Sequence, residues 1–437
     1  MTTVAGALIP KRNDAPEIHT QPNRDKSAPK MKTVQWYGTK DMRVVEEYRP
    51  LITDPEDVII KVTSAAICGS DLHLYGGFMP GMKKGDIMGH ETMGIVESVG
   101  PDVKSLKSGD RVVVAFDIAC SHCTYCEKGA YSGCDNTNPS KEQEALYGHH
   151  TAGLFGYSHL TGGYPGGQAE YLRVPLADTN CLKIEEDAAK LSDDKLLLIS
   201  DVLATAWHAN ELGSVQSGDN VAIWGAGPVG ILTAHCAQAR GAARVVLIDR
   251  DEFRLNFARE KLPGIETINF TEKKTLDALH EMFQDEQGRY VGVDCAIEAV
   301  GFHYANSWLH KVEMALKLEN DPSETINELI YAVRKAGRIS VVGVYSGYCN
   351  HLNIGAFMEK GLTMAAGQTP VQKYWKKLLK LVRDGALDPS MVITHHLSLD
   401  KAPAAYKMFD DKDDGCVKVV LNPSTAGTGG QQAMSEQ

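Results

Sequence analysis

The sequence predicts an α/β protein built from two kinds of domain, a β-rich barrel-like domain and a doubly wound parallel sheet. Short runs rich in Val, Ile and Thr, separated by Gly, Pro and Asp, fill residues 31–116 and predict the first domain. Strand-like and helix-like runs alternate over residues 202–355 and predict the second. With 437 residues, 43% of them hydrophobic, the chain is long enough to bury two or three cores.

The expected segments follow from these patterns. Residues 1–30 are polar and without periodicity, which is typical of a flexible arm, and residues 424–437 are rich in Gly, Gln and Ser, which is typical of a disordered tail. We expect residues 31–201 and 356–423 to form the β-rich domain, and residues 202–355 to form the parallel-sheet domain.

Charge and composition exclude several classes of partner. A formal net charge of −11 and a pI near 5.8 argue against nucleic acid or an anionic membrane surface as the main partner. No apolar run approaches the ~18 residues of a transmembrane helix, and the first thirty residues lack the apolar core of a secretory signal. We therefore expect a cytoplasmic protein that acts on a small molecule.

The most informative motif is a glycine-rich turn between a predicted strand and a predicted helix. The apolar run 221–224 leads into a G-x-G-x-x-G pattern, which in a Rossmann domain allows a tight turn, close approach of a pyrophosphate and packing of helix on strand. A second strand then ends at Asp249, about where a ribose-binding carboxylate is expected. This acid favours NAD over NADP, although Arg250 beside it could accommodate a 2′-phosphate. The predicted cofactor-binding residues in the turn are Gly225, Gly227, Pro228, Val229 and Gly230.

A compact group of cysteines predicts a structural zinc. Four of the ten cysteines, Cys120, Cys123, Cys126 and Cys134, supply four thiolates, which fill every position of a closed tetrahedral site. Ten cysteines are too few for a disulfide scaffold in a chain of this length. The alternatives are four unpaired cysteines in a loop or an iron–sulfur cluster, whose usual following proline is missing here.

A second, dispersed group predicts an open zinc site. Cys68 directly follows one strand-like run, and His90 comes just before another. Either residue alone would more often belong to the core. Together, ahead of a dinucleotide-binding motif, they suit a catalytic zinc, which has three protein ligands and leaves one position for substrate or water.

Taken together, these residues make the sequence from about Met31 to Pro423 resemble the zinc-dependent medium-chain alcohol dehydrogenases. The resemblance implies that Asp201 is the third ligand of the catalytic zinc, at a position where many relatives have Cys. Asp at this position is similar to the branch of glutathione-independent formaldehyde dehydrogenases. The motifs that carry the resemblance to the family are Cys68-Gly-Ser-Asp, Gly89-His-Glu, the four cysteines, the Gly225 turn and residues 293–301 and 337–343. Asp201 lies in residues 200–208, the place that matches the third ligand. Gly166-Gly-Gln-Ala-Glu-Tyr171 and Gly367-Gln-Thr-Pro-Val-Gln-Lys-Tyr374 are also similar to the formaldehyde dehydrogenase branch.

The same resemblance implies roles for the remaining site residues. Ser70 would take the proton of an alcohol and His73 would relay it towards solvent, which suits a hydroxyl beside a metal and an imidazole that titrates near neutral pH. Asp71 would orient a zinc ligand, and Glu91 would lie behind His90 or bind the zinc transiently. Two further basic residues would bind the cofactor, Arg254 near the adenosine ribose and Lys418 at the pyrophosphate. A homodimer or homotetramer is expected.

Two segments allow alternative interpretations. Residues 148–166, rich in His and aromatic residues, form either a surface loop or a substrate lid. Residues 302–320 form either a surface or subunit contact or a flap over the adenosine end of the cofactor, and Pro322 and Glu324 then predict the start of a helix that Gly337 ends.

The expected activity is hydride transfer between NAD(H) and an alcohol/aldehyde pair with two zinc ions per chain. The alternatives are an aldehyde dismutase that keeps NAD(H) tightly bound and a non-catalytic NAD-binding redox sensor, because a fold alone does not prove activity.

Overall fold

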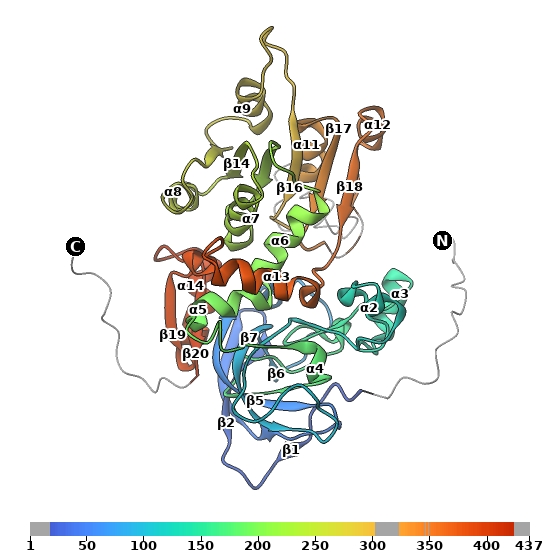
Figure 1. Ribbon diagram of the computed structural model, residues 1–437, viewed down its shortest axis with the longest axis vertical. Coiled ribbons are helices and arrows are strands. Elements are labelled where there is room, and N and C mark those ends of the chain that lie inside the picture. The colour runs from blue at the N-terminus through green and yellow to red at the C-terminus, as the bar shows by residue number, and fades with distance from the viewer. Residues whose placement is uncertain (1–17, 302–322, 346, 348, 424–437) are drawn as a thin grey trace, which may run out of the picture. The chain divides into compact units, whose positions relative to one another are not determined.

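The computed structural model describes residues 18–301, 323–345, 347 and 349–423 (Figure 1). The chain forms two compact units, one that ends at Ser200 and resumes at Ile393, and one from Asp201 to Val392. The predicted flap at residues 302–320 and the predicted tail at 424–437 lie outside the described residues. In the part of the chain that is described, no helix is both long and apolar enough to cross a bilayer.

The first unit is built on a mainly antiparallel seven-stranded sheet. Its strands follow the order β12-β8-β7-β5-β20-β19, and β11 also pairs with β5. They are β5 (Val58–Ile67), β7 (Glu91–Val99), β8 (Arg111–Val114), β11 (Tyr171–Val174), β12 (Cys181–Lys183), β19 (His395–Ser398) and β20 (Val419–Asn422). A smaller sheet contains β2 (Met31–Gly38), β3 (Asp41–Glu47) and β6 (Asp86–Ile87). The predicted β-rich domain is therefore present.

Part of the expected flexible arm is ordered. Residues 1–17 lie outside the described residues, but β1 (Arg24–Asp25) pairs with β4 (Arg49–Pro50). Arg173 donates a hydrogen bond to the carbonyl of His19, whose own N–H donates to Asp54 at 3.1 Å. Polar groups of the segment whose composition suggested disorder therefore form hydrogen bonds with other parts of the first unit.

The second unit contains a parallel six-stranded sheet, as predicted. Its order is β15-β14-β13-β16-β17-β18, so that later strands lie on both sides of β13. The strands are β13 (Asn220–Trp224), β14 (Arg244–Asp249), β15 (Glu266–Asn269), β16 (Val293–Glu298), β17 (Val333–Val341) and β18 (Thr363–Ala366). The helices are α6 (Val202–Leu212), α7 (Pro228–Ala239), α8 (Glu252–Lys261), α9 (Thr275–Met282), α11 (Glu324–Ala332), α12 (Ile354–Glu359) and α13 (Val371–Arg383).

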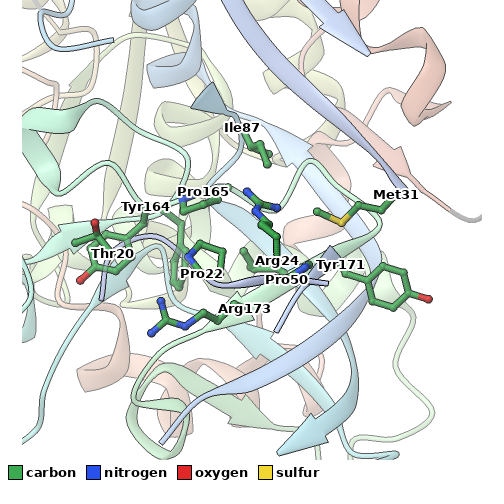
Figure 2. Close-up of a pocket in the computed structure, with 13 residues that line it drawn as sticks. Thr20, Pro22, Arg24, Met31, Pro50, Ile87, Tyr164, Pro165, Tyr171 and Arg173 are labelled. Atoms are coloured by element: carbon green, nitrogen blue, oxygen red, sulfur yellow. The ribbon is translucent and has the colours of Figure 1, made fainter. Parts of the chain in front are cut away.

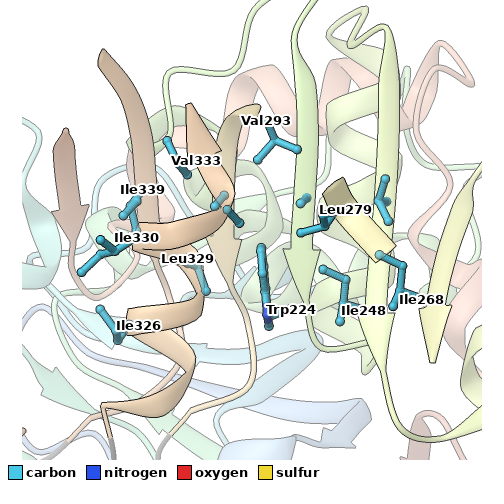
Figure 3. Close-up of a cluster of buried hydrophobic side chains, with 14 of the residues drawn as sticks. Trp224, Ile248, Ile268, Leu279, Val293, Ile326, Leu329, Ile330, Val333 and Ile339 are labelled. Atoms are coloured by element: carbon cyan, nitrogen blue, oxygen red, sulfur yellow. The ribbon is translucent and has the colours of Figure 1, made fainter. Parts of the chain in front are cut away.

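The core on one face of this sheet is made by α9 and α11 (Figure 3). Leu279 of α9 and Leu329 of α11 pack with Trp224 and Ile248 from the strands, and all four are buried. The indole N–H of Trp224 donates to Glu328 at 2.9 Å, which satisfies its polar edge inside an apolar cluster. This packing holds the carboxyl ends of the strands, where the glycine turn begins.

Two boundaries differ from the sequence prediction. The chain leaves the parallel-sheet unit after Val392 rather than at residue 355, because β18 pairs with β17 and α13 packs on α6. Helix α11 ends at Ala332, and Gly337 lies in β17 and does not terminate the helix. The pairing of β16 with β17 jumps from Val333 to Arg338, so the residues between them bulge out of the ladder.

Candidate active site and metal centres

The end of β5 and the start of β7 bring the first predicted site residues together. Ala66 pairs with Glu91 in the ladder between these strands. Cys68 follows β5 as the N-cap of helix α1 (Gly69–Tyr75), and His90 directly precedes β7. One ligand atom from each of Cys68, His90 and Glu91 therefore lies within 4.8 Å of the other two, and all three residues are buried.

Asp71 orients the imidazole of His90. Its Oδ1 lies 3.0 Å from His90 Nδ1, and its Oδ2 accepts a hydrogen bond from the backbone N–H of Cys68 at 3.0 Å. The carboxylate is fully buried, so water does not compete for these contacts. With Nδ1 held by a carboxylate, Nε2 is the nitrogen of His90 that can bind a metal. The role of Asp71 in orienting a zinc ligand stays a prediction.

Ser70 lies beside that nitrogen. Its Oγ is 3.3 Å from His90 Nε2, so the hydroxyl is next to the position where a metal would bind. His73 is three residues further along α1 and half-buried, on the same side of the helix by its spacing. The proton relay through Ser70 and His73 stays a prediction.

Lys418, predicted to contact the cofactor, has a partner within the protein. Its ammonium forms an ion pair with Glu91, and neither side chain has exposed surface. The pairing follows from the sheet, because Val419, the next residue, is the ladder partner of Ile67, beside Cys68. A buried charge requires a partner of opposite sign. The contact of Lys418 with a pyrophosphate stays a prediction.

Asp201 is the first residue of the second unit and the N-cap of α6. The residue before it, Ser200, accepts a hydrogen bond from the backbone N–H of Phe116 at 3.2 Å, and the ring of Phe116 lies edge-on to that of His90 with centroids 6.1 Å apart. Ser200 is therefore anchored near His90, and Asp201 is the next residue. Asp201 is buried, and its side chain accepts a hydrogen bond from Thr205.

The four predicted structural cysteines form a second cluster in the first unit. Their sulfur atoms all lie within 4.8 Å of one another, with Cys120 and Cys126 4.0 Å apart and Cys123 and Cys134 also 4.0 Å apart. Hydrogen bonds from its neighbours lower the pKa of the Cys120 thiol, and those with Cys120 raise the pKa of Cys126. Four sulfur donors at this spacing, all buried, suit a closed tetrahedral zinc site.

The glycine turn has the shape of a pyrophosphate cradle. Gly225 has φ +102°, which favours glycine. A Cβ on Gly230 would lie 1.8 Å from the carbonyl oxygen of Gly225, so only glycine lets α7 pack on β13. At Gly227, the N-cap of α7 with Pro228 as the first helical residue, the nearest atom to a built Cβ is Arg254 Nη1 at 3.8 Å. The backbone there is open to a ligand.

The two predicted ribose-site residues lie at this turn. Asp249 Oδ2 accepts a hydrogen bond from the backbone N–H of Ala226 at 2.7 Å, and Arg254 of α8 points its guanidinium towards Gly227. An acid at the end of β14 and a base on the following helix therefore both lie close to the glycine turn.

Aromatic side chains pack around His90. The ring of Tyr157, from the predicted lid segment 148–166, lies edge-on to His90 with centroids 6.1 Å apart, as does Phe116. The same segment lines a pocket in which Tyr164 and Pro165 lie near Arg24 and Arg173 (Figure 2). No predicted metal or catalytic residue lines this pocket. Much of the segment is buried, so it is packed on the first unit, and one of its residues reaches the candidate site.

Sequence reasoning missed three features of the site: the Lys418–Glu91 ion pair, the aromatic contact of Phe116 and the hydrogen bond from Thr205 to Asp201. Of these three, only the hydrogen bond from Thr205 could have been predicted from local spacing, because Thr205 lies one helical turn after Asp201 and can therefore reach it.

Comparisons with known proteins show the family of the chain. Residues 54–186 match the model of the alcohol dehydrogenase GroES-like domain. The chain is similar to a zinc-type alcohol dehydrogenase-like protein of Schizosaccharomyces pombe, with 43% identity over 409 residues, 92% of this chain and 93% of that one. The chain belongs to the zinc-type alcohol dehydrogenase family.

Two further similarities support the assignment of the chain to this family. The chain is 33% identical over 397 residues to a glutathione-independent formaldehyde dehydrogenase of Pseudomonas aeruginosa, and the match covers 86% of this chain and 94% of that one. The solved structure of an alcohol dehydrogenase of Thermus sp. ATN1 is similar with a TM-score of 0.74 and 32% identity, covering 90% of this chain and 99% of that one. The predictions of the family, the two-domain α/β fold and a zinc-dependent oxidoreductase that uses NAD(H) on an alcohol or aldehyde are confirmed.

Proposed function

We propose that this dehydrogenase transfers hydride between an alcohol/aldehyde pair and NAD(H) at an open zinc site held by Cys68, His90 and Asp201. The observation that carries the proposal is the buried pair of Cys68 and His90, with Asp71 on the far nitrogen of the imidazole. A thiolate, an imidazole and a carboxylate are three ligands that suit zinc and leave its fourth position to the substrate.

The charges around this site also fit a divalent cation. Cys68 and Asp201 would bring two negative charges, which balance Zn²⁺, and the charge of Glu91 is balanced by Lys418. When bound, zinc supplies a Lewis acid for the substrate oxygen and the nicotinamide supplies the hydride acceptor. The protein has to orient the ligands, exclude water and remove one proton for each hydride transferred.

Removal of the proton falls to Ser70 and His73. Because Ser70 Oγ lies 3.3 Å from His90 Nε2, its hydroxyl is next to the proposed substrate position and accepts the alcohol proton. It passes its own proton towards His73, the half-buried base one turn along α1. Phe116 and Tyr157 form an apolar wall at His90 that limits access of water.

We further propose a preference for NAD over NADP. The Asp249 carboxylate lies at the glycine turn, where it can accept a hydrogen bond from a ribose 2′-hydroxyl and repels a 2′-phosphate. The test compares kcat/KM for the two cofactors, and equal values would overturn the preference. A homodimer or homotetramer and a cytoplasmic location stay predictions.

The ligand set is tested by elemental analysis of the purified full chain and of Asp201→Ala. Wild type should contain two zinc ions, and the variant should keep the zinc of the four cysteines and lose turnover, measured by the absorbance of reduced nicotinamide. Wild type with no zinc beyond the four-cysteine site would overturn the proposal. Equal yields of alcohol and acid from an aldehyde, without added cofactor, would instead identify the dismutase alternative.

A further inference from the structure

Asp201 is held in an unusual way for the first residue of a helix. An Asp at this position usually accepts a hydrogen bond from a backbone N–H of the first turn. Asp201 makes no such side-chain cap on α6. Its Oδ1 instead accepts a hydrogen bond from Thr205 Oγ1 at 2.8 Å, and its carbonyl accepts from the backbone N–H of Thr205 at 2.7 Å. The carboxylate therefore contacts a side chain one turn along α6 and does not cap a backbone N–H of the first turn.

A second hydroxyl extends this contact. Thr369 Oγ1 lies 3.0 Å from Thr205 Oγ1, and Thr369 is 2% exposed. An ionised carboxylate only accepts hydrogen bonds, so Thr205 must donate to Asp201. Its hydroxyl hydrogen is then used, and its oxygen accepts from Thr369. The order of donation, from Thr369 to Thr205 to Asp201, is therefore set by chemistry.

Thr369 belongs to a motif that the proposed function leaves unexplained. It lies in the segment Gly367–Tyr374, which enters α13, and α13 packs against α6 (Figure 1). The segment contacts α6 a second time through Tyr374, whose hydroxyl is 2.7 Å from His208 Nδ1. The contact of Thr369 continues through Thr205 to Asp201, whereas the contact of Tyr374 with His208 does not reach Asp201.

We propose that Thr205 and Thr369 are positioning residues that orient the Asp201 carboxylate for the catalytic zinc. The inference rests on the proposed function, because it requires Asp201 to be a ligand. A hydrogen bond to one carboxylate oxygen fixes the rotation of the group, so that less freedom is lost when the metal binds. Thr205 does for Asp201 what Asp71 does for His90.

The experiment measures zinc affinity of the open site in full-length Thr205→Val, Thr205→Ser, Thr369→Val and Tyr374→Phe. Affinity is determined by competition with a chromogenic chelator, and the zinc of the four cysteines is the internal reference for folding. Thr205→Val should weaken the open site roughly 10- to 100-fold, as losses of such orienting contacts do. Thr369→Val should weaken it less. Thr205→Ser keeps the hydroxyl and should stay close to wild type.

Co²⁺ substitution gives a readout that does not depend on turnover. The absorbance of Co²⁺ bound next to Cys68 should shift in Thr205→Val and return in Thr205→Ser. Tyr374→Phe removes the other hydrogen bond between α6 and the same segment and should leave affinity and spectrum unchanged.

Two results would overturn the inference while leaving the proposed function intact. One is wild-type affinity in both valine variants. The other is an equal loss in Tyr374→Phe, which would mean that docking of α13, and not the hydroxyl pair, holds Asp201. Absence of a second zinc from wild type would instead overturn the proposed function itself.

Discussion

Acidification is expected to destabilise the second unit through His208. His208 lies on α6 and is 8% exposed, and its Nδ1 lies 2.7 Å from the Tyr374 hydroxyl. Burial, with a smaller contribution from the charge of Lys373, lowers the pKa of His208 to about 4. A histidine in an unfolded chain titrates near about 6.5. The folded protein therefore holds the neutral form over a range in which the unfolded chain binds a proton.

The sign and the size of the effect follow from these two pKa values. Because the unfolded chain binds more protons between them, the stability that neutral His208 contributes is present above the unfolded pKa and is lost as the pH falls towards about 4. The linkage relation gives a loss of about 2 kcal/mol in the free energy of unfolding between about pH 7 and pH 5.

The assay is urea denaturation at a series of pH values for wild type and His208→Asn. The Asn amide reaches the position of Nδ1, so it can still bond to Tyr374, but it does not titrate. Subtracting the two pH profiles removes the contributions of the other titrating groups, including the metal sites. Wild type should lose about 2 kcal/mol more than the variant over this interval.

Tyr374→Phe is the control for the cause of the shift. This variant lacks the hydroxyl and keeps His208. Because burial is the main cause of the lowered pKa, the stability of the variant should depend on pH as that of wild type does. Parallel profiles for wild type and His208→Asn would refute the reasoning.

Three other predictions concern the metal lobe and the cofactor turn. Cys123→Ser should remove the zinc of the closed site and cost about 4 kcal/mol or more of stability, measured by elemental analysis and thermal unfolding, because a structural metal is lost. Gly230→Ala should weaken NAD binding more than about tenfold in calorimetry, because its Cβ would meet the Gly225 carbonyl at 1.8 Å and open the turn. Asp249→Ser should raise kcat/KM for NADP relative to NAD by about tenfold or more, since it removes the carboxylate that repels the 2′-phosphate.

Features that depend on neighbours in the sequence could be predicted well. The four cysteines lie between positions 120 and 134, and the glycine turn joins one strand to the next helix. For such features the spacing of residues fixes which side chains can meet, because few backbone conformations connect them. The alternation of strands and helices likewise determined the parallel sheet.

Features that depend on distant segments were missed or misplaced. The ion pair of Lys418 with Glu91 was missed because it depends on strand register: the neighbouring Val419 pairs with Ile67 and thereby brings Lys418 to Glu91. Helix α11 was extended to Gly337 because its apolar spacing continues through Val333, but Val333 pairs with Val293 in the sheet instead. A ladder partner outweighs local helical preference, and only the fold supplies it.

The sequence by itself therefore determined which ligand types are available, which family the chain resembles and where the glycine turn lies. The tertiary structure decided how those groups are held. Asp71 contacts Nδ1 of His90, and Lys418 forms an ion pair with Glu91. Thr205 donates a hydrogen bond to Asp201 and accepts one from Thr369. The reason is physical. Ligand identity is a property of single residues, whereas orientation depends on hydrogen bonds whose donors and acceptors can come from segments far apart in the chain, and strand register and helix packing alone bring these together.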